Sequence, residues 1–124
     1  MIFTSEELQK FLKNNINVAY CKILKNLGSS PREEGAWMLI SKQGNIFGTI
    51  GGGQLEYSLI QSVMKQDWKV DFNLDIETTL GPDIAQCCGG KVIISILKMN
   101  YMLSKHLLEK LKKDIAKFTQ VLIF

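Results

Sequence analysis

Residues 36–50 have the sequence AWMLISKQGNIFGTI, in which two apolar runs flank a short polar turn. The runs 36–41 and 46–50 have the composition of strands, and Gln43-Gly44-Asn45 has the residue types of a hairpin turn. Two strands joined by so short a turn run antiparallel, because a parallel return needs a crossover of a dozen or more residues. This stretch therefore predicts an antiparallel hairpin and argues against a regular doubly wound sheet.

Three further stretches outside the hairpin have strand patterns. Val18 to Lys25 is rich in β-branched and alternating residues, and residues 70–80 alternate between apolar and polar side chains at a period of two. The alternation predicts a half-buried strand whose outer face is polar. Residues 92–97 form a nearly continuous apolar run, which predicts a strand covered on both faces.

Helical spacing appears in three places. Thr4 and Glu7 have the spacing of a capping box and predict a helix at about 4–14. Apolar residues recur at helical spacing from residue 54 to about 66, and again in a basic stretch at 102–118. We therefore predict an α+β fold, with a mixed or mostly antiparallel sheet flanked by helices, a C-terminal helix and a final strand at 119–124.

The composition is that of an ordinary globular protein. The chain has 124 residues, of which 46% are hydrophobic and 22% charged, and its formal net charge is +3. No run approaches the roughly 18 to 20 apolar residues that span a bilayer. The basic stretch near the end is interrupted by Glu109 and Asp114, which favours a solvated helix face over a nucleic-acid surface. Three cysteines without the spacing of a disulfide framework predict a cytoplasmic protein.

Two glycine-bearing segments have the residue types of anion sites. Gly28-Ser29-Ser30-Pro31-Arg32 offers two hydroxyls, backbone N–H groups and a guanidinium, although a surface loop with a turn proline explains it equally well. Gly51-Gly52-Gly53 precedes a predicted helix, where free N–H groups and the helix dipole favour an anion. A tight strand-to-helix turn is the alternative. Glu56, in the first helical turn, either favours the dipole or orients a ligand group.

A third segment, residues 81–90, contains the adjacent thiols Cys87 and Cys88 followed by two glycines. Neighbouring side chains on an extended chain point to opposite faces, so the two thiols cannot easily share one metal. We expect one thiol to face a ligand and the other to face inward. A thiol beside glycine-rich backbone and near a helix N-terminus would have a lowered pKa and affinity for soft metals or sulfur. Cys21, in a predicted strand, is interpreted as a buried structural residue.

Other catalytic arrangements have little support in the sequence. His106 lies in the lysine-rich helix and has no evident nucleophile or base as a partner. Asp71, Asp75 and Glu77 alternate along the predicted outer face of a strand, which suits solvation better than paired-carboxylate catalysis. Trp37 and Trp68 are expected in or at the edge of the core.

The three segments follow one another in an order that resembles a known family. The motifs are Gly28-Ser29-Ser30-Pro31-Arg32, Gly48-Thr49-Ile50-Gly51-Gly52-Gly53 with Leu55-Glu56, and Leu80-Gly81-Pro82 with Gln86-Cys87-Cys88-Gly89-Gly90. Together they resemble the N-terminal domain of the xanthine dehydrogenase accessory factors, the XdhC/CoxI family. Carried over by position, the resemblance implies a cofactor-binding set of Ser29, Ser30, Arg32, Gly51, Gly52, Gly53, Glu56, Gln86, Cys87 and Cys88, in which Cys87 or Cys88 contacts molybdenum.

The resemblance implies an accessory protein and not an enzyme. Members of this family bind the molybdenum cofactor (molybdopterin), promote its maturation by terminal sulfur addition, and deliver it as chaperones to a xanthine dehydrogenase-type molybdenum hydroxylase. A cysteine desulfurase is then the expected source of the sulfur. The alternatives are a thiol-dependent redox or sulfur-transfer protein that uses Cys87 and Cys88, and a truncated remnant that keeps the fold without the function.

The resemblance also implies a domain organisation. Residues 1–98 correspond to the N-terminal domain, and residues 99–124 correspond to a linker helix and the truncated start of a Rossmann-like domain. A strand at 119–124 would present an apolar edge, and such an edge invites pairing with another chain. We therefore predict either a homo-oligomer or a separate Rossmann-domain partner.

Overall fold

The computed structural model describes residues 4–27, 34–51, 53–79 and 91–110. The chain divides into two compact units. One unit is Asn17–Lys98 and contains the sheet, and the other combines Met1–Ile16 with Met99–Phe124.

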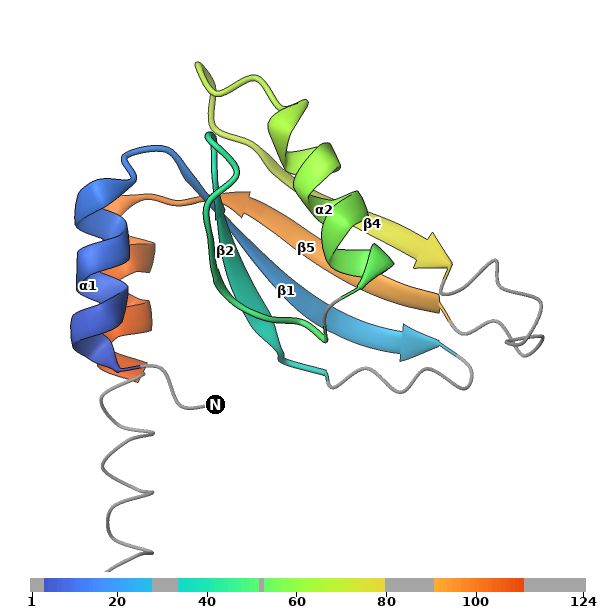
Figure 1. The fold of residues 1–124 in the computed structure, drawn as a ribbon. Helices are drawn as coiled ribbons and strands as arrows, with labels where there is room; N and C mark the ends of the chain where they lie inside the picture. Colours follow the sequence, from blue (N-terminus) through green and yellow to red (C-terminus); the bar gives the residue numbers. More distant parts are fainter. Residues whose placement is uncertain (1–3, 28–33, 52, 80–90, 111–124) are drawn as a thin grey trace, which may run out of the picture. The chain divides into compact units, whose positions relative to one another are not determined.

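The sheet has five strands, and every neighbouring pair runs antiparallel. Their order across the sheet is β3-β2-β1-β5-β4. The strands are β1 (Val18–Leu27), β2 (Trp37–Ser41), β3 (Ile46–Gly48), β4 (Asn73–Thr79) and β5 (Lys91–Lys98). Figure 1 shows β1 and β4 pointing to the same side, on either side of β5, which runs in the opposite direction. The predicted α+β fold with an antiparallel sheet is confirmed for the described residues.

The hairpin predicted from residues 36–50 is present as β2 and β3. Ser41 N–H donates to the Asn45 carbonyl at 2.8 Å, and Asn45 N–H donates to Ser41 Oγ at 2.9 Å. Gly44 has a φ of +92°, which the turn requires and glycine adopts without strain. Strand β3 ends at Gly48, two residues earlier than predicted, because its φ of +82° takes the backbone out of the β region.

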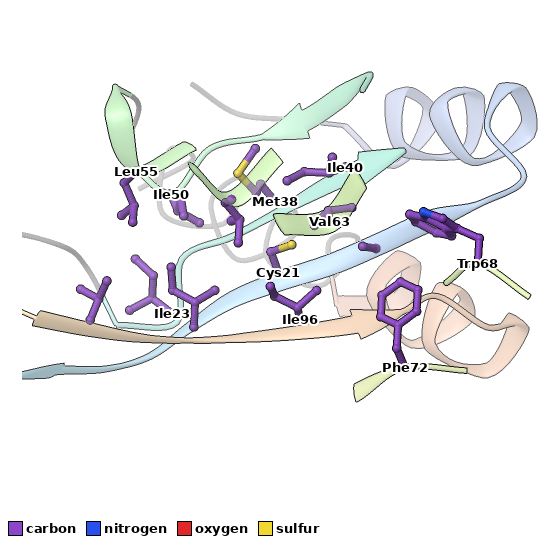
Figure 2. Packing of buried hydrophobic residues seen from close by; sticks show 14 residues of the cluster. Cys21, Ile23, Met38, Ile40, Ile50, Leu55, Val63, Trp68, Phe72 and Ile96 are labelled. Carbon is purple, nitrogen blue, oxygen red and sulfur yellow. The ribbon is translucent and has the colours of Figure 1, made fainter. Parts of the chain in front are cut away.

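Helix α2 (Gln54–Met64) lies over one face of the sheet and forms the core with it. Its apolar stripe of Leu55, Leu59 and Val63 is buried, as the helical spacing predicted. The helix ends at Met64, two residues before the predicted end. Figure 2 shows how the side chains of α2 meet those of β1, β2 and β5. The sheet side of this core comprises Ala19, Cys21, Ile23, Met38, Ile40, Val92, Ile94 and Ile96.

Strands β4 and β5 show how the pattern of side chains follows burial. Asp75 and Glu77 are exposed, whereas Leu74 and Ile76 pack against the core, so the predicted polar outer face of this strand is confirmed. In β5 the residues facing α2 are fully buried, but Ile93 and Leu97 on the other face are only partly buried. The expected complete cover of both faces of β5 is therefore wrong for the second face.

The second unit contains two described helical segments. Helix α1 (Ser5–Asn14) begins after Thr4, whose Oγ1 accepts the Glu7 N–H at 3.1 Å, as the capping pattern predicted. Residues 101–110 are helical, and Asn100 Oδ1 accepts the Leu103 N–H at 2.8 Å at their start. The rest of the predicted helix and the predicted strand at 119–124 lie outside the described residues. Within the described ranges, no helix is long and apolar enough to cross a bilayer.

Candidate functional site

The strand ends that flank the three motif segments lie at one end of the sheet, which we call the loop end. Leu27, the last residue of β1, pairs with Lys91, the first residue of β5, and Lys91 also pairs with Thr79, the last residue of β4. Gly48, the last residue of β3, pairs with Met38 near the start of β2. An antiparallel sheet in this order therefore places the described flanks of residues 28–33, 49–53 and 80–90 on the same side.

The described residues of the second motif segment, 49–51 and 53, connect β3 to α2, and we call them the glycine turn. Gly51 and Gly53 both have positive φ values, of +122° and +72°. A Cβ atom added at Gly53 would meet nothing within 4 Å, so the backbone there faces open space. Gly53 is the N-cap of α2, and no side chain among the described residues caps the helix. The first-turn N–H groups of a helix have no partner within the helix, so this turn suits an anionic group.

Glu56 and Thr49 connect the two sides of the glycine turn. The Thr49 hydroxyl and the Ile50 N–H both donate to Glu56 Oε2, the latter at 3.0 Å. Gly51 N–H donates to Thr49 Oγ1 at 3.0 Å. We call this set of hydrogen bonds the Thr49–Glu56 latch. The latch occupies the Gly51 N–H. It also binds the carboxylate of Glu56, a predicted ligand-binding residue, to Thr49 and Ile50.

A second carboxylate, that of Glu34, joins the described residues on the two sides of the first motif segment. The residues just before β2 also pair with β1. Ile23 N–H donates to the Ala36 carbonyl at 2.9 Å, and Gly35 N–H donates to the Ile23 carbonyl at 2.9 Å. Nearer the motif, Glu34 Oε1 accepts the Asn26 N–H at 3.0 Å. The Glu34 side chain therefore extends the pairing with β1 as far as Asn26, close to where the described residues end.

The predicted site residues divide into two groups. Gly51, Gly53 and Glu56 lie in the described structure, and all three belong to the glycine turn and the first turn of α2. The others lie outside the described residues, so their approach to the glycine turn stays a prediction, and so does contact of a cysteine with metal. They are Ser29, Ser30, Arg32, Gly52, Gln86, Cys87 and Cys88.

The remaining chemistry-bearing residues have the structural surroundings expected of them. Cys21 is fully buried in the core, and this burial raises the pKa of its thiol to about 12. Burial also raises the pKa of Tyr20, with a smaller contribution from Cys21. His106, Asp75 and Glu77 are exposed. Among residues in the described ranges, no three His, Cys, Asp or Glu side chains gather as metal ligands.

Thr49 and Glu34 are the residues that sequence reasoning missed. Thr49 was part of a quoted motif, but its hydroxyl was not assigned a role. Its partner Glu56 lies seven residues away, across a strand end and a turn. Helical and strand periodicity do not connect positions seven residues apart across a turn. The glycines at 51–53 were the sequence signal for a turn that could bring them together.

Comparison with known proteins supports the resemblance inferred from the motifs. Residues 11–66 match the model of the XdhC and CoxI family, a range that includes the first two motif segments. A crystal structure described as that of a xanthine dehydrogenase from Bacillus halodurans matches with a TM-score of 0.68 and 24% identity over 92% of this chain. At this identity the match shows the fold. The chain spans 36% of that structure's length. No curated protein matches the chain.

Proposed function

We propose that the chain is an accessory protein that binds the molybdenum cofactor and serves in its sulfuration and insertion into a xanthine dehydrogenase-type molybdenum hydroxylase. The family match over residues 11–66 supports an accessory role. The observation that carries the proposal is the pairing of Leu27 with Lys91 and of Lys91 with Thr79 at the loop end, toward which β3 also runs before it ends at Gly48. These strand ends flank all three motif segments.

The described part of the site fits an anionic group. The backbone at Gly53 is open, and the start of α2, which no described side chain caps, offers N–H donors with the positive end of the helix dipole behind them. When bound, the molybdenum cofactor supplies a phosphate, a polar pterin edge and a metal held by dithiolene sulfurs. The glycine turn would hold the anionic end, and Arg32 with Ser29 and Ser30 would add charge-assisted hydrogen bonds.

The thiols are proposed for the other end of the ligand. A thiolate is a good ligand for soft metals and a good acceptor of sulfur, so Cys87 or Cys88 would approach the molybdenum, with Gln86 beside them. The proposed partners are the hydroxylase client and a cysteine desulfurase, in the cytoplasm. A second copy or a separate Rossmann-domain protein is proposed as a further partner.

The test is cofactor retention by the full chain. The protein is purified from a host that makes the molybdenum cofactor, and its pterin and molybdenum are measured by fluorescence and by elemental analysis. We expect both in the wild-type protein, and a large loss in the Cys87→Ala or Cys88→Ala variant. The matched control is Cys21→Ala, which removes a thiol from the core and should leave the cofactor content unchanged.

Other outcomes would contradict the proposal. A wild-type protein with neither pterin nor molybdenum would overturn cofactor binding. Thiol turnover in the absence of pterin would favour the redox or sulfur-transfer alternative. Equal losses in all three cysteine variants would show that cofactor content follows stability and not the thiols of residues 87 and 88.

A further inference from the structure

Strand β4 lies at one edge of the sheet, beyond β5 (Figure 1). Lys98 N–H donates to the Phe72 carbonyl at 2.9 Å, so the backbone groups of Phe72 face β5. Residues along an antiparallel strand direct their N–H and C=O groups alternately toward the partner strand and away from it. The register between β4 and β5 has no break, and it therefore turns the backbone groups of Asn73, Asp75 and Glu77 away from β5.

These outward backbone groups form a free edge. Within the described part of the chain, no residue forms a hydrogen bond with the N–H or C=O groups of Asn73, Asp75 or Glu77. The side chains of the same three residues are exposed. An edge strand with free donors and acceptors is a template on which another extended segment can add.

The two faces of β4 favour different side chains on such a segment. On the α2 side, Leu74 and Ile76 pack against the core but are only partly buried, so apolar neighbours would remove more of their surface from water. On the outer face, Asp75 and Glu77 are exposed acids. Glu77 forms an ion pair with the exposed Lys91, whereas Asp75 forms none with a described residue. Opposite charges on directly paired strand residues stabilise a sheet.

The acids argue against a second copy of β4 as the added strand. Two antiparallel β4 strands that pair around Asp75 or around Ile76 would place an acid of one copy directly opposite an acid of the other. Like charges in such positions are destabilising, and charged residues commonly protect edge strands in this way. A segment that adds to β4 is therefore expected to be basic where β4 is acidic.

We propose that the free edge of β4 binds an extended segment of a partner protein, which adds as a further antiparallel strand. The segment alternates lysine or arginine, opposite Asp75 and Glu77, with apolar residues beside Leu74 and Ile76. Backbone hydrogen bonds supply affinity for any extended chain, and the two rows of side chains select its sequence. This docking edge goes beyond the proposed cofactor binding and does not depend on it.

The probe is a short synthetic peptide of alternating lysine and valine, titrated into the full chain, with a glutamate–valine peptide of the same length as the matched control. We expect the lysine peptide to bind roughly tenfold more tightly at low salt. NMR should show slower hydrogen exchange of the Asn73, Asp75 and Glu77 amides in the complex. The amides of Leu74 and Ile76 already face β5 and should change little, which distinguishes strand addition from attraction of cations to acids. Failure of both peptides to bind, or unchanged exchange along the edge, would overturn the proposal.

Two methylated forms of the lysine peptide test the backbone bonds without changing the protein. In the proposed antiparallel pairing, Asp75 and Glu77 exchange backbone hydrogen bonds with the residues directly opposite them, which are the lysines. N-methylation of the lysine amides should therefore abolish binding, whereas N-methylation of the valine amides should leave most of it. Equal binding by the two methylated peptides would contradict strand addition.

Reversal of charge on the protein tests the selection of sequence. In the double variant Asp75→Lys with Glu77→Lys, the preference should reverse, so that the glutamate peptide binds roughly tenfold more tightly than the lysine peptide. The matched control is Glu6→Lys with Glu109→Lys, which changes the net charge equally at exposed positions of the other unit. The control should keep the preference for lysine. An equal change of preference in both double variants would show that net charge, and not the row on β4, selects the peptide, and would overturn the proposal.

Discussion

The two ends of the sheet are held together by different groups. At the loop end, the carboxylates of Glu34 and Glu56 accept backbone N–H groups from Asn26 and Ile50. At the opposite end, Lys98 Nζ donates to the backbone carbonyls of Trp68 at 2.7 Å and Val70 at 3.4 Å.

This opposite end, which we call the closed end, also contains direct backbone bonds. Lys98 N–H donates to the Phe72 carbonyl at 2.9 Å, and Lys42 N–H donates to the Asn17 carbonyl at 2.8 Å. Around the glycine turn, the backbone N–H groups of Ile50 and Gly51 are bound by side chains, those of Glu56 and Thr49. The two ends therefore differ in the charged group that holds the backbone, a lysine ammonium at the closed end and carboxylates at the loop end.

Two glycines near the two ends of β3 give the largest expected contrast. Gly48 and Gly44 both have positive φ, so alanine is strained at either position. At Gly48 an added Cβ would also lie 3.0 Å from the Trp37 carbonyl oxygen, whereas at Gly44 the nearest atom is Met64 Sδ at 4.0 Å. We expect Gly48→Ala to lower the free energy of unfolding by about 3 kcal/mol and Gly44→Ala by about 1 kcal/mol, measured by urea titration. Equal losses would show that strain alone matters at both ends.

The lysine at the closed end gives the next effect. Lys98→Met removes two charge-assisted hydrogen bonds to carbonyls, so we expect the free energy of unfolding to fall by about 2 kcal/mol. Lys69→Met is the matched control, because Lys69 is an exposed lysine in the α2–β4 connection whose carbonyls Lys98 binds. Under the proposed function, cofactor retention should be unchanged in both proteins, unlike in Cys87→Ala or Cys88→Ala. A loss of cofactor in Lys98→Met at full stability would contradict this expectation.

Cys21, between the two ends, makes stability depend on pH. Its pKa is raised from 9.0 to about 12 by burial, so above pH 9 the unfolded chain loses the thiol proton while the folded chain keeps it. The unfolded state then binds fewer protons, and stability falls as pH rises between 9 and 12, by up to about 1.4 kcal/mol per pH unit. We expect urea unfolding at pH 8 to 10 to show a steeper decline for the wild type than for Cys21→Ala. Parallel declines would contradict this assignment.

Much of the fold could be predicted because local pattern and burial agree. The hairpin at residues 36–50 combined apolar runs with a glycine turn, and the alternation near Asp75 and Glu77 matched the exposed face of a strand. The predictions were wrong where tertiary structure determines the burial of a strand face or the end of a strand. The apolar run at 92–97 suggested cover on both faces, but Ile93 and Leu97 are only partly buried. Strand β3 stopped at Gly48 because of one backbone angle.

The site was less predictable than the fold. Gly51 and Gly53, with positive φ, lie between β3 and α2, as the alternative of a strand-to-helix turn had predicted, but the sequence could not show that Thr49 and Glu56 bond across them. Their meeting depends on the exit angle of β3 and on the packing of α2 against the sheet, which are properties of the whole unit. The same reason explains why Glu56 was interpreted as a ligand residue or a dipole partner and not as part of a latch.

The smallest expected effect tests whether every carboxylate at the loop end matters. Glu77 forms an ion pair with Lys91 at 3.4 Å on the outer face of β4 and β5, and the two side chains are 55% and 51% exposed. Water and salt screen such a pair, so Glu77→Gln should change the free energy of unfolding by less than about 0.5 kcal/mol, and less still at high salt. Asp75→Asn, on the same face of the same strand, is the matched control. Urea titrations of both variants at low and high salt provide the measurement.

A loss above about 1 kcal/mol for Glu77→Gln alone would mean that exposed charge pairs also stabilise this end. The contrast between Glu77 and the two carboxylates that bind backbone N–H groups would then disappear, because what distinguishes Glu34 and Glu56 is the backbone donor and not the charge.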